Sequence, residues 1–91
     1  MLGKEFNEKK VFAQGMTLIG QVKDISVDPE TYMVTDLIVQ LEKESARKIF
    51  GEKFMIGGPQ VKAPVSAIDK LGDVISLKFG VDELKNRLIR L

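Results

Sequence analysis

The 91-residue sequence contains no cysteine, no histidine and no tryptophan. Without cysteine, a disulfide framework, a thiolate nucleophile, a zinc knuckle and an iron–sulfur cluster are all excluded. Without histidine, the chain lacks the usual general base at neutral pH and the commonest transition-metal ligand. Because most catalytic sites need one of these side chains, we expect a protein that is not an enzyme and that uses no cofactor or metal ion.

The sequence also lacks a dominant charge and a long apolar run. Its 14 Lys and Arg residues against 13 Asp and Glu residues give a net charge of +1. A protein that binds several phosphates by electrostatics is usually more basic, so nucleic acid is not the favoured partner. No apolar run approaches the ~20 residues of a transmembrane segment. The N-terminal residues show no apolar stretch typical of a signal peptide, and we expect a cytoplasmic location.

What is present indicates one soluble domain over residues 1–91, since 44% of the residues are hydrophobic and 30% are charged. Alternating or continuous apolar residues predict the strands, and Gly and Pro mark where they end. Phe54, Met55 and Ile56 could begin one more strand. The strands are predicted over 9–13, 17–27, 33–41, 61–65 and 74–79. The fold class is therefore mainly β, with the barrel over about 9–79.

Two of these strands form a predicted hairpin. In 17–27 the apolar alternation changes face, and a bulge near Lys23 and Asp24 would return Ile25 and Val27 to the side of Val22. Residues 28–31 (Asp-Pro-Glu-Thr) are typical of a type I turn. The strand that follows is expected to turn its odd-numbered residues inward, from residue 33 to residue 41.

Two helices are expected. Residues 44–50 have a helix-forming composition and are followed by Gly51, a residue typical of the C-terminal cap of a helix. Residues 81–91 repeat apolar side chains at helical spacing, with acids in the first turn and bases later, which favours a C-terminal helix.

Several segments together resemble the PRC-barrel family, the small barrel found in the photosynthetic reaction-centre H subunit and in the ribosome maturation factor RimM. The likeness covers about residues 9–79, is closest to stand-alone archaeal members, and rests on residues 19–31, 34–39, 61–68 and 71–77. In the family's pattern, glycines stand where this chain has Tyr32 and Asp36. The first departure requires a turn that avoids or tolerates a positive φ at a bulky residue.

The resemblance implies a PRC-type β-barrel of five to six strands, with a short helix after the central hairpin. It also implies a docking module or adaptor and not a catalyst. Stand-alone archaeal members resemble homodimeric adaptors, some linked to cell division, whereas RimM associates with a ribosomal protein during small-subunit assembly. We therefore expect a homodimeric scaffold or adaptor, with cell division as the preferred setting. The alternative is an accessory factor in RNA processing or ribosome assembly.

Surplus apolar side chains mark the predicted interaction patch. A barrel this small needs one inward face, so apolar residues elsewhere remain near the surface unless the helices cover them. A patch on a two-fold axis is used twice, which favours a homodimer. The predicted patch consists of Val34, Ile38, Phe50, Phe54, Met55 and Ile56.

Two further groups have a plain and a functional interpretation. Lys85, Arg87 and Arg90 could meet RNA phosphates or an acidic lipid surface, although such charges are usually the solvated face of a helix. Asp24, Asp28 and Glu30 lie close in sequence, but calcium loops need a denser ligand array. We therefore expect Asp24 at the bulge, Asp28 as a turn cap and Glu30 in solvent.

Overall fold

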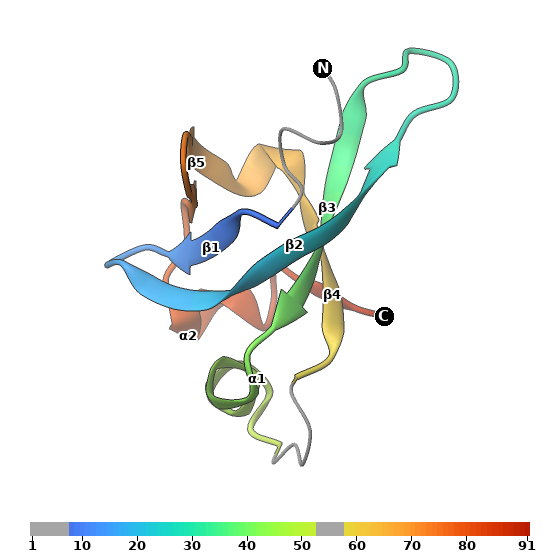
Figure 1. The fold of residues 1–91 in the computed structure, drawn as a ribbon. Helices are drawn as coiled ribbons and strands as arrows, with labels where there is room; N and C mark the ends of the chain where they lie inside the picture. The colour runs from blue at the N-terminus through green and yellow to red at the C-terminus, as the bar shows by residue number, and fades with distance from the viewer. Residues whose placement is uncertain (1–7, 53–57) are drawn as a thin grey trace.

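A curled seven-stranded sheet forms the frame of the computed structural model, which describes residues 8–52 and 58–91 (Figure 1). The described strands are ordered β5-β6-β1-β2-β3-β4-β7, and all neighbours are antiparallel except β1 and β6. The predicted mainly β fold class is confirmed. The elements are β1 (Lys10–Ala13), β2 (Thr17–Val27), β3 (Val34–Leu41), α1 (Lys43–Phe50), β4 (Gln60–Pro64), the 3-10 helix η2 (Val65–Ala67), β5 (Ile68–Leu71), β6 (Ile75–Leu77), α2 (Val81–Leu84) and β7 (Ile89–Arg90).

The predicted bulge in β2 is present. The pairing of β2 with β3 skips a residue between Val22 and Asp24, and the Asp24 carboxylate accepts the Ile25 N–H at 2.8 Å. Val22 is fully buried, and Ile25 packs half-buried against the same core, so the bulge returns Ile25 to the inner face. Val27 differs from the prediction: it lies beyond a second shift of register and is exposed.

The alternation predicted for β3 holds where the strand crosses the core. Leu37, Val39 and Leu41 are buried, and the intervening residues are only partly covered. Met33 and Thr35 were expected on the inner face but are exposed. They lie at the turn end of the hairpin, which extends past the core and leaves these two side chains with nothing to pack against.

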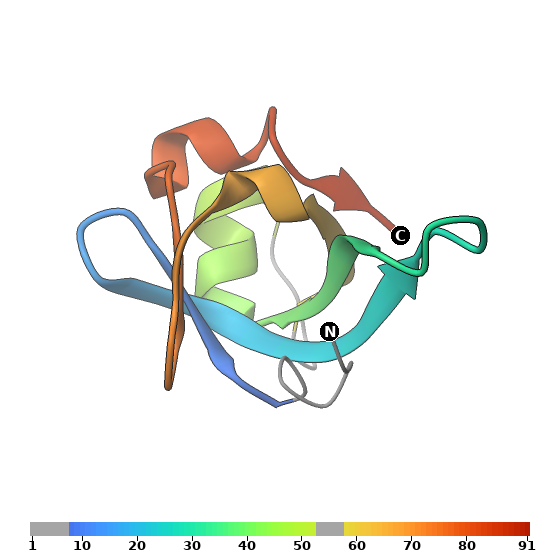
Figure 2. The same ribbon diagram turned by 90° about the horizontal axis from the view of Figure 1, so that it is seen from above.

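Helix α1 is amphipathic and lies across one end of the curled sheet (Figures 1 and 2). Its buried residues Ser45, Ala46 and Ile49 recur at helical spacing, and the Ser45 hydroxyl donates to the Leu18 carbonyl oxygen of β2 at 2.9 Å. The predicted stop at Gly51 is confirmed. Gly51 has a left-handed φ of 72° and donates its N–H to the Arg47 carbonyl.

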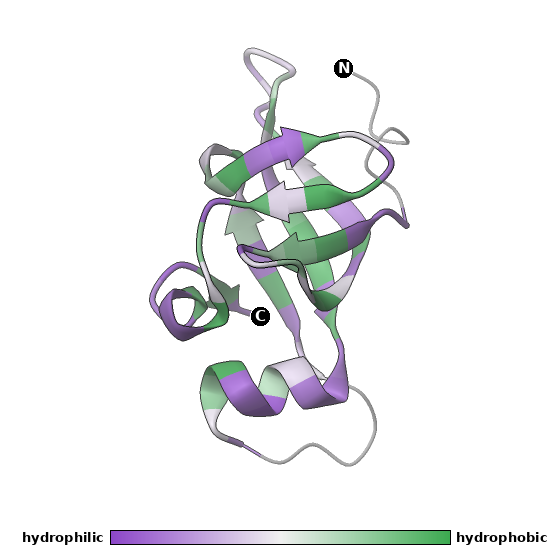
Figure 3. Ribbon diagram, turned by 90° about the vertical axis from the view of Figure 1, so that its left-hand side faces the viewer, coloured by the Kyte–Doolittle hydropathy of each residue, from purple (hydrophilic) through white to green (hydrophobic). Residues whose placement is uncertain are grey.

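The core lies inside the curl of the sheet and beneath the two helices. Apolar and polar residues alternate along the strands and α1, as expected for elements with one covered face (Figure 3). Residues from every strand except β5 and β7, from both helices and η2, and from the segment between α2 and β7 contribute buried apolar side chains. These are Val11, Ala13, Ile19, Val22, Leu37, Val39, Leu41, Ala46, Ile49, Val61, Ala63, Ala67, Ile75, Leu77, Leu84 and Leu88.

The C-terminal helix is much shorter than predicted. It covers Val81–Leu84, a turn occupies 85–87, and the chain then forms β7. Strand β7 pairs with β4, and the Leu91 N–H donates to the Gln60 carbonyl oxygen at 3.0 Å. Leu84 and Leu88 are buried as the helical spacing required, but Leu91 is exposed. The helical spacing gave a wrong prediction because it carries no information about β4. The open edge of β4 has unpaired backbone N–H and C=O groups, with which a further strand can pair.

The sheet also has more strands than the five or six expected. The additional ones are the short edge strands β5 and β7, and β5 has only partly covered or exposed residues. Such strands leave little apolar periodicity to detect. The strand predicted to start at Phe54, Met55 and Ile56 lies outside the described residues. Within the described part of the chain, no helix is long and apolar enough to span a membrane.

Candidate interaction surfaces

The predicted apolar patch does not assemble as one exposed surface among its described members. Val34 and Phe50 are partly buried and pack against the core cluster. Ile38 lies on the outer face of β3, half-buried, between Asp24 of β2 and Lys62 of β4 in the strand register. The remaining members, Phe54, Met55 and Ile56, lie outside the described residues. Ile38 is therefore the described member that retains the character of a surface residue.

The predicted basic group does not lie on a helix. Lys85 and Arg87 are in the turn after α2, and Arg90 is on β7; all three are exposed. The Arg87 guanidinium lies 4.3 Å from the centre of the Phe79 ring. Arg90 forms an ion pair with Glu52 at 2.9 Å and lies 5.5 Å from the centre of the Phe50 ring. Both arginines therefore have contacts within the protein that a phosphate would have to replace or share.

Among the residues that the structure describes, three exposed apolar side chains lie close in sequence at the end of the β2–β3 hairpin. Residues 27–33, which we call the hairpin tip, project away from the body of the sheet (Figures 1 and 2). Within the tip, 44% of Val27, 78% of Tyr32 and 67% of Met33 is exposed. Sequence patterns placed Val27 and Met33 on the inner face and therefore missed this group.

The hairpin tip is tied together by its own hydrogen bonds. The Asp28 N–H donates to the Met33 carbonyl at 2.9 Å, and the Tyr32 N–H donates to the Asp28 carbonyl at 2.8 Å. The Asp28 carboxylate also accepts the Glu30 N–H at 2.8 Å. These contacts confirm the predicted capping role of Asp28, while Glu30 is exposed as expected. Tyr32 and Met33 are thus presented from a closed turn.

Tyr32 adopts a backbone conformation that favours glycine. Its φ is 58°, so the turn tolerates a positive φ at a bulky residue. A non-glycine residue in this region costs on the order of 1 kcal/mol. Because most of the side chain is exposed, burial within this chain does not offset that cost. The departure from glycine at this position was visible in the sequence, and an exposed tyrosine beside the turn was expected from it.

A second exposed apolar group is on the C-terminal strand. Ile89 and Leu91 are two residues apart, so they share one face of the extended chain, and 61% and 62% of them is exposed. Ile89 is next to Lys62 of β4, which is in turn next to Ile38 of β3. The outer face of the sheet thus carries apolar residues separated by a lysine.

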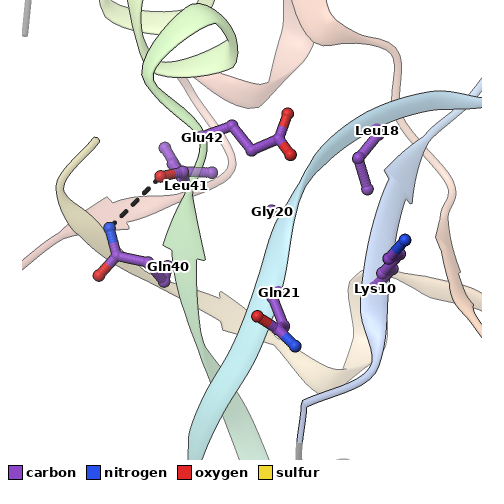
Figure 4. A pocket seen from close by; sticks show the side chains of 7 residues that line it. All are labelled: Lys10, Leu18, Gly20, Gln21, Gln40, Leu41 and Glu42. Atoms are coloured by element: carbon purple, nitrogen blue, oxygen red, sulfur yellow. Dashed lines mark hydrogen bonds between the residues drawn. The ribbon is translucent and has the colours of Figure 1, made fainter. Parts of the chain in front are cut away.

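A hollow of about 220 Å³ lies over β1, β2 and the end of β3, and Figure 4 shows the side chains that line it. Lys10 and Glu42 give it charges of opposite sign. The Gln40 amide donates to the Gly58 carbonyl at 2.5 Å and the Gln21 amide to the Glu8 carbonyl at 2.8 Å, so both are already engaged. The lining residues are Lys10, Leu18, Gly20, Gln21, Gln40, Leu41 and Glu42. This hollow has room for a small side chain or polar group. Its lining carries one positive and one negative charge, so it has no excess charge that would select an ion.

No protein-family model matches the sequence, and a search of the curated proteins finds no significant match. The resemblance to PRC barrels therefore stays a prediction.

Proposed function

We propose that this chain is a non-catalytic protein-interaction module that acts as a homodimeric scaffold or adaptor. The observation that carries the proposal is the gathering of exposed apolar side chains at the hairpin tip. Three of them lie within seven residues of a projecting turn. Small monomeric proteins seldom expose large apolar side chains together, and such groups usually mark a protein contact.

A second apolar group supports the adaptor role in particular. Ile89 and Leu91 belong to a different element from the hairpin tip and give the domain a second apolar surface. An adaptor holds at least two molecules at once, and two separate apolar surfaces meet that requirement. The setting in cell division rests on the resemblance to stand-alone archaeal PRC barrels.

A role in RNA processing or ribosome assembly remains the alternative. It receives less support from the site, because Arg87 lies over Phe79 and Arg90 pairs with Glu52. Sequence-tolerant RNA binders combine a basic groove with several stacking aromatic side chains. The exposed Tyr32 lies instead in a segment whose charged residues are acidic.

The first test is the mass of the purified chain in solution across the micromolar range, by light scattering and sedimentation velocity. We expect twice the mass of one chain, and a monomer at every concentration contradicts the homodimer. Ile38→Glu tests the predicted patch: it is expected to lower the mass if the outer sheet face takes part in the contact. Circular dichroism of the variant controls for loss of the fold.

The second test identifies the partner class by affinity capture in lysate of the native host, with and without RNase. Recovery of division proteins that is insensitive to RNase supports the adaptor. Ribosomal proteins whose recovery RNase abolishes would instead favour the alternative. Anisotropy of labelled RNA at low and high salt gives an independent measure, because phosphate binding weakens steeply as salt is added.

A further inference from the structure

The hairpin tip lies within a segment that carries charge of one sign. Residues 24–42 contain five acidic residues (Asp24, Asp28, Glu30, Asp36 and Glu42) and no basic residue. All 14 lysine and arginine residues therefore lie elsewhere in the chain. Of these five acidic residues, Asp36 forms an ion pair: its carboxylate lies 3.9 Å from the Lys62 ammonium nitrogen. We call 24–42 the acidic segment and the other described residues, 8–23, 43–52 and 58–91, the basic remainder; the latter carries 12 basic and seven acidic residues.

This charge distribution restricts what the apolar tip can contact. Nucleic acid and anionic lipid surfaces are disfavoured, because Asp28 and Glu30 flank the apolar side chains of the tip. Two tips in contact are also disfavoured, since like charges placed together oppose association. The complementary surface is apolar or neutral at its centre and basic at its rim. The basic remainder of a second copy of this chain has the required sign.

The tip is also built to bind at low entropic cost. Its backbone hydrogen bonds between Asp28 and Met33 and between Tyr32 and Asp28 hold the turn closed. A binding surface that is already ordered loses less freedom on association. Tyrosine adds a large contact area with few rotatable bonds, which is why it is common among residues that dominate binding energy.

We infer that the hairpin tip binds a second copy of this chain, with Tyr32 and Met33 against the basic remainder of that copy. In a two-fold dimer each tip meets the body of the other chain, so the contact is made twice. The inference rests on the homodimer of the proposed function and adds which surface makes it.

The β1–β2 turn provides a matched control. Met16 in that turn also has a positive φ, 64°, and is 71% exposed. Tyr32→Gly and Met16→Gly therefore each remove one exposed apolar side chain and each relieve a left-handed residue. The two sites differ in their charged neighbours. Tyr32 lies near Asp28 and Glu30, whereas residues 14–17, which include Met16, contain no charged residue.

The experiment measures the dimer dissociation constant by sedimentation velocity for the wild-type chain and both variants. We expect Tyr32→Gly to weaken the dimer at least about tenfold, as for a residue that dominates an interface, and Met16→Gly to leave it unchanged. The Glu30→Lys substitution, at an exposed residue, is expected to give a weaker dimer than the wild-type chain. Added salt is expected to weaken the wild-type dimer, because salt screens the attraction between opposite charges. Met33→Gln provides a second tip variant if Tyr32→Gly loses its circular dichroism signal.

The outcomes separate the two proposals. A dimer that survives both Tyr32→Gly and Met33→Gln overturns the role of the tip and leaves the homodimer intact. A wild-type chain that is monomeric throughout overturns the homodimer and the tip contact together. If Met16→Gly weakens the dimer as much as Tyr32→Gly, the effect is not specific to the tip and the inference is also overturned.

Discussion

Gly20 of β2 faces the backbone of Gln40 of β3 so closely that a side chain cannot be inserted. A Cβ atom on Gly20 would lie 2.2 Å from the Gln40 carbonyl oxygen, and the obstructing atom belongs to the backbone and not to a movable side chain. Gly20 is buried, and it pairs with Leu41 across the same strands. The close pairing of β2 with β3 at the end of the ladder away from the hairpin turn therefore depends on glycine.

We expect Gly20→Ala to lower the free energy of unfolding by about 2–3 kcal/mol, because β2 and β3 would have to move apart. Gly58→Ala should also destabilise, since its Cβ would lie 2.8 Å from that of Ala46. Urea denaturation followed by circular dichroism measures both. Gly72→Ala is the control, because no atom lies within 4 Å of its Cβ position. Equal stability of the Gly20→Ala and Gly72→Ala proteins would contradict the close approach.

The strain at Tyr32 predicts an unusual order of stabilities. Tyr32→Gly should be more stable than Tyr32→Ala by about 1 kcal/mol, because alanine retains the cost of the positive φ and glycine does not. At most other positions glycine is the less stable of the two. Thermal and urea unfolding of the two variants test this order. Alanine equal to or above glycine would mean that residue 32 leaves the left-handed region in solution.

The left-handed cap at the end of α1 gives a third prediction. Gly51 has open space around its Cβ position, so a substitution there acts through the backbone alone. We expect Gly51→Ala to lower the free energy of unfolding by about 1 kcal/mol, and Gly51→Asn to lower it less, since asparagine tolerates this conformation. Equal losses for the two variants would argue against the left-handed cap.

The corrected C-terminus predicts different effects for two leucines of the same helical pattern. Leu88→Ala should cost about 2–3 kcal/mol, because Leu88 is buried, whereas Leu91→Ala should change stability by less than about 0.5 kcal/mol. A continuous helix over 81–91 would instead bury both leucines on one face. Similar losses for the two variants would therefore favour the helix over β7. Chemical denaturation under identical conditions provides the comparison.

The sequence predicted those parts of the fold that arise from local patterns. Alternation placed Leu37, Val39 and Leu41 in the core, a change of face located the bulge before Ile25, and Gly51 marked the end of α1. These signals depend on neighbouring residues only. The mainly β fold class followed from them.

The parts that failed depend on contacts between distant segments. Ile89 and Arg90 form a strand because β4 has an open edge, which no pattern within 81–91 reveals. Met33 and Val27 have the alternation of core residues, but the hairpin extends beyond the core that would cover them. The hairpin tip was missed for this reason, since its exposure is a property of where the core ends.

The parallel pairing of β1 with β6 bears on how the chain folds as it is synthesised. Val11 pairs with Ile75, so one side of β1 stays without its neighbour until most of the chain has left the ribosome. In the β2–β3–β4 meander, by contrast, the strands pair in chain order, with α1 inserted between β3 and β4. Contacts between distant residues slow folding because a long loop must close before they form. We therefore expect the meander to form first and β1 to be completed late, which leaves its backbone open to mispairing in nascent chains.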